Sequence, residues 1–154
     1  MTAGRESARL GAASPGRQPG RLSNLATALR LVAKETGDQA AVGEAVSALR
    51  TALAALSADD LRRAAYLANL SLCLYDRGDL DEAIGLAREV ASRAAPLDAR
   101  RAWYQANLGV TLMSRSRRMP DDPADVTGAA QVWQAAAADP AAPALARLRA
   151  AAAW

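Results

Sequence analysis

A helical hairpin recurs along this chain, and the recurrence limits the fold more than any other feature of the sequence. The first helix of the hairpin carries the segments 22–25, 67–70 and 105–109, and the second helix carries 44–46, 81–84 and 129–131. Repetition at a period of about 40 residues is typical of stacked helix pairs, each of which buries one face against its neighbours. The sequence therefore predicts an all-α fold, an α-solenoid of antiparallel helix pairs with about three hairpins plus a terminal helix.

The composition supports a purely helical chain. Alanine, the residue with the highest helix propensity, is far more frequent among the 154 residues than in an average protein. No segment alternates apolar and polar residues as a half-buried strand does, and no apolar run reaches the length of about 20 residues that a membrane span needs. We expect helices at 22–35, 40–56, 61–76, 80–94, 98–118 and 124–138, with a seventh beginning near Ala144.

Glycine and acidic residues mark the expected helix ends. Gly37 and Gly78 should end the first and third helices in the left-handed conformation that glycine adopts readily. The segment 57–60 and Asp79 should cap the helices that follow them, because a carboxylate or hydroxyl oxygen accepts hydrogen bonds from the free N–H groups of a first helical turn.

Residues 1–20 are predicted to form a disordered basic tail, since they are rich in glycine, proline and arginine and poor in large apolar side chains. The helical repeat domain is predicted to span 21–154, with repeats at about 21–58, 59–96 and 97–140 and a partial fourth at 141–154. The tail has no apolar region like that of a secretory signal, and Cys73 is the only cysteine, so no internal disulfide can form. The expected location is therefore the cytoplasm.

The residue inventory argues against catalysis. The chain has no histidine and one cysteine, which excludes Ser-His-Asp and Cys-His pairs and every zinc site with an imidazole ligand. We expect no enzyme activity, no cofactor and no bound metal. The net charge of +3 is carried almost entirely by arginine, but acidic residues are interleaved with the arginines. No basic cluster contains the aromatic residues that would stack on bases, which argues against a nucleic-acid partner.

The middle hairpin carries a more specific motif. Leu67 and Leu70 lie on its first helix, and its turn and second helix begin with the run GDLDEAI at 78–84. This pattern resembles the tetratricopeptide repeat (TPR), a helix–turn–helix unit of about 34 residues. The resemblance implies a right-handed solenoid in which the first helices of the hairpins line a concave face.

The first and third copies are longer than the middle one. The interval from the core leucine of the first helix to the core alanine of the second is 13 residues from Leu70 to Ala83, but 20 residues from Leu25 to Ala45. Four of the added residues precede the turn and three follow it. Each addition is about one helical turn, so Leu25 is expected to stay in the buried face.

A narrower resemblance comes from the Asn-Leu pairs on the first helices and from the Ala-Ala-x-x-Trp pattern at 129–133. Together they resemble the degenerate TPR arrays of actinobacterial proteins that often precede a CHAT domain, a caspase-like peptidase module. The resemblance covers about 22–154. Any peptidase activity would belong to a separate domain or chain, because the His–Cys dyad of that module needs a histidine.

Five residues are candidates for contact with a partner. Asn24, Asn69 and Asn107 recur just before Leu25, Leu70 and Leu108, on the helices that line the groove in peptide-binding TPR proteins. The alternative is that each amide hydrogen-bonds locally between neighbouring helices.

The other two candidates, Trp103 and Tyr104, open the fifth helix. Adjacent helical positions diverge by about 100°, so one ring should pack inward while the other is free to face the groove. Trp133, by contrast, is expected in the core between repeats. The arginines at 115–118 invite a phosphate, but their place at a helix C-terminus explains them without a ligand.

These observations favour a non-catalytic protein–protein interaction or scaffold module that binds a peptide or partner domain through its concave face. Two alternatives stay open: a structural spacer or regulatory segment of a CHAT-type peptidase effector, and a weak RNA- or phosphate-binding helical repeat. The array ends in an incomplete hairpin, which also suggests self-association through the C-terminal end face.

Overall fold

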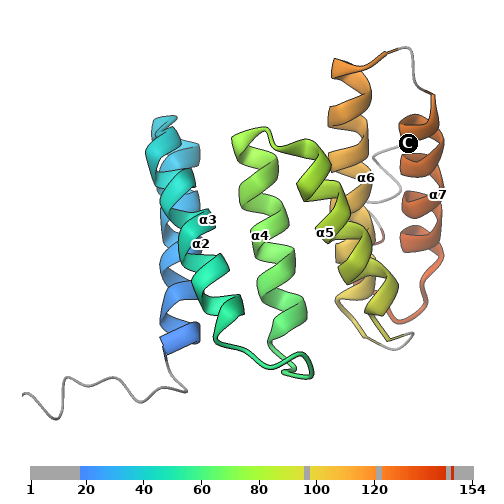
Figure 1. Cartoon of the computed structure of the whole chain (residues 1–154). Helices are drawn as coiled ribbons and strands as arrows, with labels where there is room; N and C mark the ends of the chain where they lie inside the picture. Colours follow the sequence, from blue (N-terminus) through green and yellow to red (C-terminus); the bar gives the residue numbers. More distant parts are fainter. Residues whose placement is uncertain (1–17, 96–97, 121–122, 145–146, 148–154) are drawn as a thin grey trace, which may run out of the picture.

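The computed structural model describes residues 18–95, 98–120, 123–144 and 147 (Figure 1). Six α-helices occupy most of this part of the chain: α2 (Gln18–Thr36), α3 (Gln39–Ala54), α4 (Arg63–Arg77), α5 (Leu80–Arg93), α6 (Arg101–Arg118) and α7 (Ala124–Ala138). The described residues contain no strand, which confirms the all-α class. None of the described helices is both long enough and apolar enough to cross a membrane.

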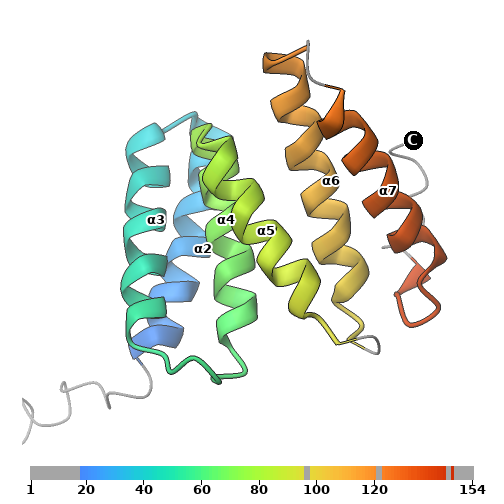
Figure 2. The same cartoon turned by 45° about the vertical axis from the view of Figure 1, so that its right-hand side comes forward.

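The helices form a row of antiparallel pairs, α2 with α3, α4 with α5 and α6 with α7. Each helix packs against the next one and runs in the opposite direction (Figures 1 and 2). In addition, α2 contacts α4, and α4 contacts α6. The last turns of α2, α4 and α6 lie at one end of the row, which we call the turn end (Figure 1). The last turns of α3 and α5 lie at the opposite end, which we call the connection end (Figure 1).

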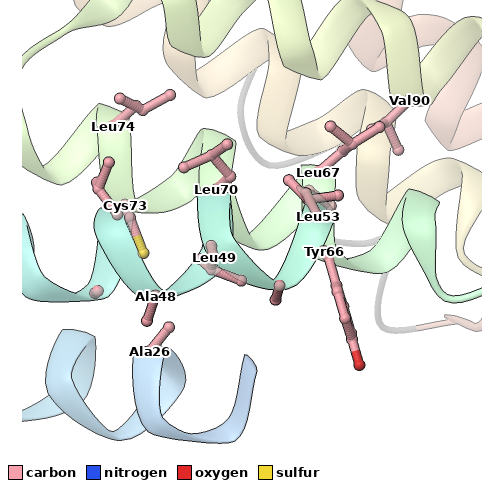
Figure 3. Packing of buried hydrophobic residues seen from close by; sticks show 14 of the residues in the cluster. Ala26, Ala48, Leu49, Leu53, Tyr66, Leu67, Leu70, Cys73, Leu74 and Val90 are labelled. Atoms are coloured by element: carbon pink, nitrogen blue, oxygen red, sulfur yellow. The ribbon is translucent and has the colours of Figure 1, made fainter. Parts of the chain in front are cut away.

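The core is divided between two main clusters. The larger one is centred on α3 and α4, where Leu49 and Leu74 are fully buried and Cys73 is almost so (Figure 3). The second lies between α5, α6 and α7, where Trp133 packs with Ile84. The expected core position of Trp133 is confirmed. Cys73 is buried and unpaired, as expected, and burial raises the pKa of its thiol to about 11.

The two predicted glycine turns are confirmed. Gly37 and Gly78 have φ angles of 75° and 95°, a left-handed conformation that side chains with a Cβ rarely adopt. The Gly78 N–H donates to the carbonyl of Leu74 at 2.9 Å and so closes the last turn of α4. After Gly37, the Asp38 carboxylate caps α3 by accepting from the N–H of Ala40 at 2.8 Å.

The predicted caps of the other helices are wrong in their detail. Asp60 does not cap α4, which begins at Arg63; its carboxylate instead accepts from the backbone N–H of Arg62 at 2.9 Å and from the Arg62 guanidinium. Asp79 does stand just before α5, but its carboxylate pairs with Arg77 and makes no cap hydrogen bond. In both places an arginine two residues away offers charge-assisted hydrogen bonds, which are stronger than a bond to a neutral N–H.

The first helix begins earlier than expected. α2 starts at Gln18, so residues 18–20 of the predicted tail belong to a helix. Pro19 fits there because proline is tolerated in the first turn, where its missing N–H has no helical partner to lose. Residues 1–17 of the tail lie outside the described residues, as does most of the expected seventh helix and partial fourth repeat.

A seven-residue motif, Asp-x-Arg-Arg-Ala-x-Tyr, opens both α4 and α6 at 60–66 and 98–104. In the second copy the Asp98 carboxylate accepts from the Arg100 backbone N–H at 2.9 Å, the same distance as in the first. In each copy this arginine holds the pKa of the aspartate carboxyl below its usual range, to about 2 for Asp60. The motif aligns α4 with α6 at an offset of 38 residues, so Asn69 and Asn107 are equivalent positions.

The expected burial of Leu25 is wrong. Leu25 is 49% exposed, whereas Leu70 and Leu108 are each 4% exposed. When α2 and α4 are aligned on their turn glycines, Leu29 takes the place of Leu70, and Ala28 takes the place of Asn69. Four added residues rotate the helix about 40° past a full turn, which is enough to carry Leu25 out of the buried face.

Candidate functional site

A hollow of about 350 Å³ opens at the turn end of the row. It lies where the last turns of α2, α4 and α6 meet the starts of α3 and α5. Its lining residues are Ala33, Lys34, Gln39, Val42, Tyr75, Asp76, Leu80, Ser114 and Arg118. A volume of this size is within the range of sites that hold a ligand or the side chains of a peptide. We call it the turn-end hollow.

Two side-chain pairs fix the walls of the turn-end hollow. Arg30 of α2 forms an ion pair with Asp76 of α4, and both side chains are largely buried, with 20% and 14% exposure. The Ser114 hydroxyl of α6 donates to the Tyr75 phenol oxygen of α4 at 3.2 Å. These contacts link the three helices in the order α2, α4, α6, so the spacing of the lining residues is set by the fold.

The remaining charge in the hollow is positive. Because Asp76 is paired with Arg30, no carboxylate among the described lining residues is left to balance the cations Lys34 and Arg118. Arg118 donates from its guanidinium to the Gly78 carbonyl at 3.0 Å, which anchors it over the α4–α5 turn without cancelling its charge. Lys34 is exposed and has no ion-pair partner among the described residues. The hollow therefore favours an anionic group.

The three candidate asparagines do not form one row. Asn69 and Asn107 are half-buried at equivalent positions of α4 and α6, seven residues before Asp76 and Ser114 of the hollow. A spacing of seven residues keeps them on the helix faces that lead to the hollow. Asn24 is exposed and out of register with them, for the same reason as Leu25. None of the three side-chain amides has a hydrogen-bond partner among the described residues, so the alternative of local hydrogen bonds finds no support there.

Trp103 and Tyr104 lie in the first turn of α6, near the connection end. Tyr104 is the ring that packs inward, at 4% exposure, and Trp103 is half-buried against it with ring centroids 5.5 Å apart. The Tyr104 hydroxyl is buried without a partner among the described residues, and burial raises its pKa. Tyr104 and Asn107 share a space of about 10 Å³, which is too small for a peptide side chain, whereas Tyr104 alone also lines a separate hollow of about 290 Å³ at the connection end.

Two of the three arginines at the end of α6, Arg115 and Arg118, have structural partners. The Arg115 guanidinium donates to both carboxylate oxygens of Asp125 on α7, each at 2.7 Å, and to Asp81 of α5 at 2.7 Å. Arg118 is held by the Gly78 carbonyl, as described above. Two of the three arginines are therefore engaged within the fold.

The acidic residues near the α4–α5 turn are engaged as well. Glu82 accepts two hydrogen bonds from Arg50, at 2.8 and 2.9 Å, and Asp81 accepts from Arg115. No group of three or more potential metal-binding side chains occurs in the part of the chain that the structure describes.

Sequence reasoning did not single out Lys34, Tyr75 or Ser114. Lys34 does stand out in the sequence, because it is the only lysine of the chain and lies in the last turn of the first helix. The last turns of successive first helices meet at the turn end, so Lys34 and Arg118 could have been expected near each other. Tyr75 and Ser114 carry no comparable signal, since their pairing depends on how α4 and α6 are rotated.

Comparisons of the chain with protein-family models, with curated proteins and with solved structures gave no match.

Proposed function

We propose that this protein is a non-catalytic protein–protein interaction module that binds an acidic segment of a partner protein in the turn-end hollow. The observation that carries the proposal is the pair of cations, Lys34 and Arg118, in a hollow where Asp76, the only carboxylate among the described lining residues, is already paired with Arg30. Clusters of cations on a fixed scaffold are a common way to recognise acidic motifs.

The helix order supports a TPR-like interpretation of this module. Contacts of α2 with α4 and of α4 with α6 are what a solenoid needs if its first helices form one face. The equivalent motifs at the starts of α4 and α6 are a second sign of internal repetition, independent of the residues that carry the TPR resemblance. We propose a right-handed TPR-like solenoid whose concave face includes Asn69, Asn107 and the turn-end hollow. We also propose that the module acts in the cytoplasm.

The two alternatives make different predictions. A phosphate- or RNA-binding repeat would use the arginines at 115–118, but the charge of Arg115 is already paired with the carboxylates of Asp125 and Asp81. A spacer attached to a CHAT-type peptidase effector would bind no acidic segment at all. Binding of an acidic peptide that weakens as the salt concentration rises, and that is lost when the chain is unfolded, would favour the proposed module.

The proposal is tested by selecting displayed random peptides on the full chain. We expect the selected peptides to be enriched in Asp and Glu, and the Lys34→Glu variant to bind them at least about tenfold more weakly, a loss of roughly 1.4 kcal/mol. Arg88→Glu is the matched control, because it makes the same change of charge at an exposed position of α5 away from the hollow lining. Equal binding by Lys34→Glu and the native chain would contradict the proposal.

A further inference from the structure

The outer face of α2 is largely apolar, with Asn24 as the one uncharged polar residue close to Ala28, and it lacks a partner among the described helices. Leu25, Leu31 and Val32 are 49%, 59% and 51% exposed, and Ala28 between them is exposed as well. The opposite face of α2, which includes Ala26 and Ala33, is buried against the rest of the row. At about 100° per residue the exposed residues lie within roughly 60° of Ala28 on either side, so they form one continuous stripe.

The stripe is complementary to itself. Arg21 lies seven residues before Ala28 and Glu35 seven residues after it, while Leu25 and Leu31 lie three residues to either side. Arg21 and Glu35 are both exposed, and neither has an ion-pair partner among the described residues. A two-fold axis through Ala28 would therefore bring Leu25 of one copy onto Leu31 of the other and Arg21 onto Glu35, at both ends of the contact.

We propose that the outer face of α2 is a homodimer interface, in which α2 packs antiparallel against α2 of a second copy around a two-fold axis at Ala28. The small side chain at the axis allows the two helices to approach closely. Two symmetric pairs of Arg21 with Glu35 specify the antiparallel orientation, because a parallel pairing would place like charges together. An interface of one helix from each copy is small, so the association is expected to be weak.

The proposed dimer leaves the turn-end hollow open. Lys34 lies six residues from Ala28, about 120° around α2, and so points away from the two-fold axis. A dimer would present two hollows, which strengthens binding to a partner with two acidic segments. The interface itself does not depend on the function proposed for the hollow.

Sedimentation equilibrium on the full chain, at concentrations up to about 1 mM, tests the interface by exchange of charge. The native chain should form dimers, and the Arg21→Glu and Glu35→Arg variants should each dimerise at least about tenfold more weakly, because each places two like-charged pairs across the axis. An equal mixture of the two variants should dimerise again, since every pair in the mixed dimer is then opposite in charge.

Each other outcome overturns the proposal. A native chain that stays monomeric excludes the interface, and a mixture that stays monomeric excludes the pairing of Arg21 with Glu35. A dimer that persists in both variants moves the contact elsewhere, for example to the C-terminal end face. Circular dichroism confirms that the exposed substitutions leave the fold intact, and Arg88→Glu should dimerise like the native chain.

Discussion

Replacing Arg115 by alanine is expected to lower the free energy of unfolding by about 2–4 kcal/mol. Arg115 donates two hydrogen bonds of 2.7 Å to Asp125, whose side chain is 5% exposed. Without the guanidinium a carboxylate would remain buried and unpaired, and the link between α6 and α7 would be lost. The loss should stay below that of a fully buried pair because the Arg115 side chain is 24% exposed.

Chemical denaturation of Arg115→Ala and Arg50→Ala measures this effect against a matched control. Arg50 also donates two hydrogen bonds to one carboxylate, that of Glu82, but both side chains are about half exposed. Its removal should cost less than about 1 kcal/mol, as for other surface pairs. Equal losses in the two variants would show that burial of Asp125 does not matter.

The same pair predicts a pH dependence. Hydrogen bonds from Arg115 lower the pKa of Asp125 below its unfolded value, so the pair stabilises the fold at any pH above the unfolded pKa of about 3.9. This stabilisation is lost as the pH falls through the folded pKa. In Arg115→Ala the buried carboxyl is instead expected to have a raised pKa. The stability difference between the two proteins should therefore begin to shrink as the pH falls through that raised pKa, above about pH 4, and should keep shrinking until the lowered pKa of the native Asp125 is passed.

Replacing Gly109 by alanine is expected to destabilise the fold by about 2–4 kcal/mol, although alanine has the higher helix propensity. A Cβ at this position would lie 2.2 Å from Nε1 of Trp133, far inside van der Waals contact. Trp133 is buried and donates from Nε1 to the Ala106 carbonyl at 3.2 Å, so the indole cannot move aside without losing its packing between α6 and α7. Thermal or denaturant unfolding measures the loss.

A helical glycine elsewhere provides the control. A Cβ on Gly85 of α5 would meet nothing within 4 Å, so Gly85→Ala should stabilise the fold by up to about 1 kcal/mol. In a Trp133→Leu background the cost of Gly109→Ala should largely disappear, because the clashing indole is gone. An unchanged cost in that background would place the strain somewhere other than Trp133.

The helices themselves could be predicted because their signals are local. Gly37 and Gly78 end their helices by backbone conformation alone, and α7 begins and ends at the predicted residues 124 and 138. The predicted helix caps are wrong where a competing side-chain interaction takes the capping group. Asp79 was expected to cap a helix by propensity, yet a nearby arginine takes its carboxylate.

The predicted register of α2 relative to α4 is wrong for a geometric reason. Counting from the Asn-Leu pair aligned Asn24 with Asn69, whereas counting back from the turn glycines aligns Ala28 with Asn69. The two alignments differ by four residues, and only the rotation of the packed helix distinguishes them. The Asp-x-Arg-Arg-Ala-x-Tyr motif, by contrast, defines the register between α4 and α6 from the sequence alone.

The turn-end hollow was less predictable than the fold, because it is assembled from the ends of five helices. Each of these helices contributes at most two residues to the lining of the hollow. The ion pair between Arg30 and Asp76, which neutralises the carboxylate of the hollow, joins residues 46 positions apart in the sequence. The sequence therefore shows only that acidic and basic residues are interleaved, whereas the structure shows which of these charges form ion pairs and which do not.

The most direct test of the proposed function is a nuclear magnetic resonance titration of the full chain with a synthetic peptide in which glutamates surround one leucine. We expect the amide shifts to change at Lys34, Tyr75, Ser114 and their neighbours at the turn end, and a peptide with lysines in place of the glutamates to cause no such change. Shifts confined to Trp103, Tyr104 and the connection end, or no shifts with either peptide, would contradict the assignment of the turn-end hollow as the binding site.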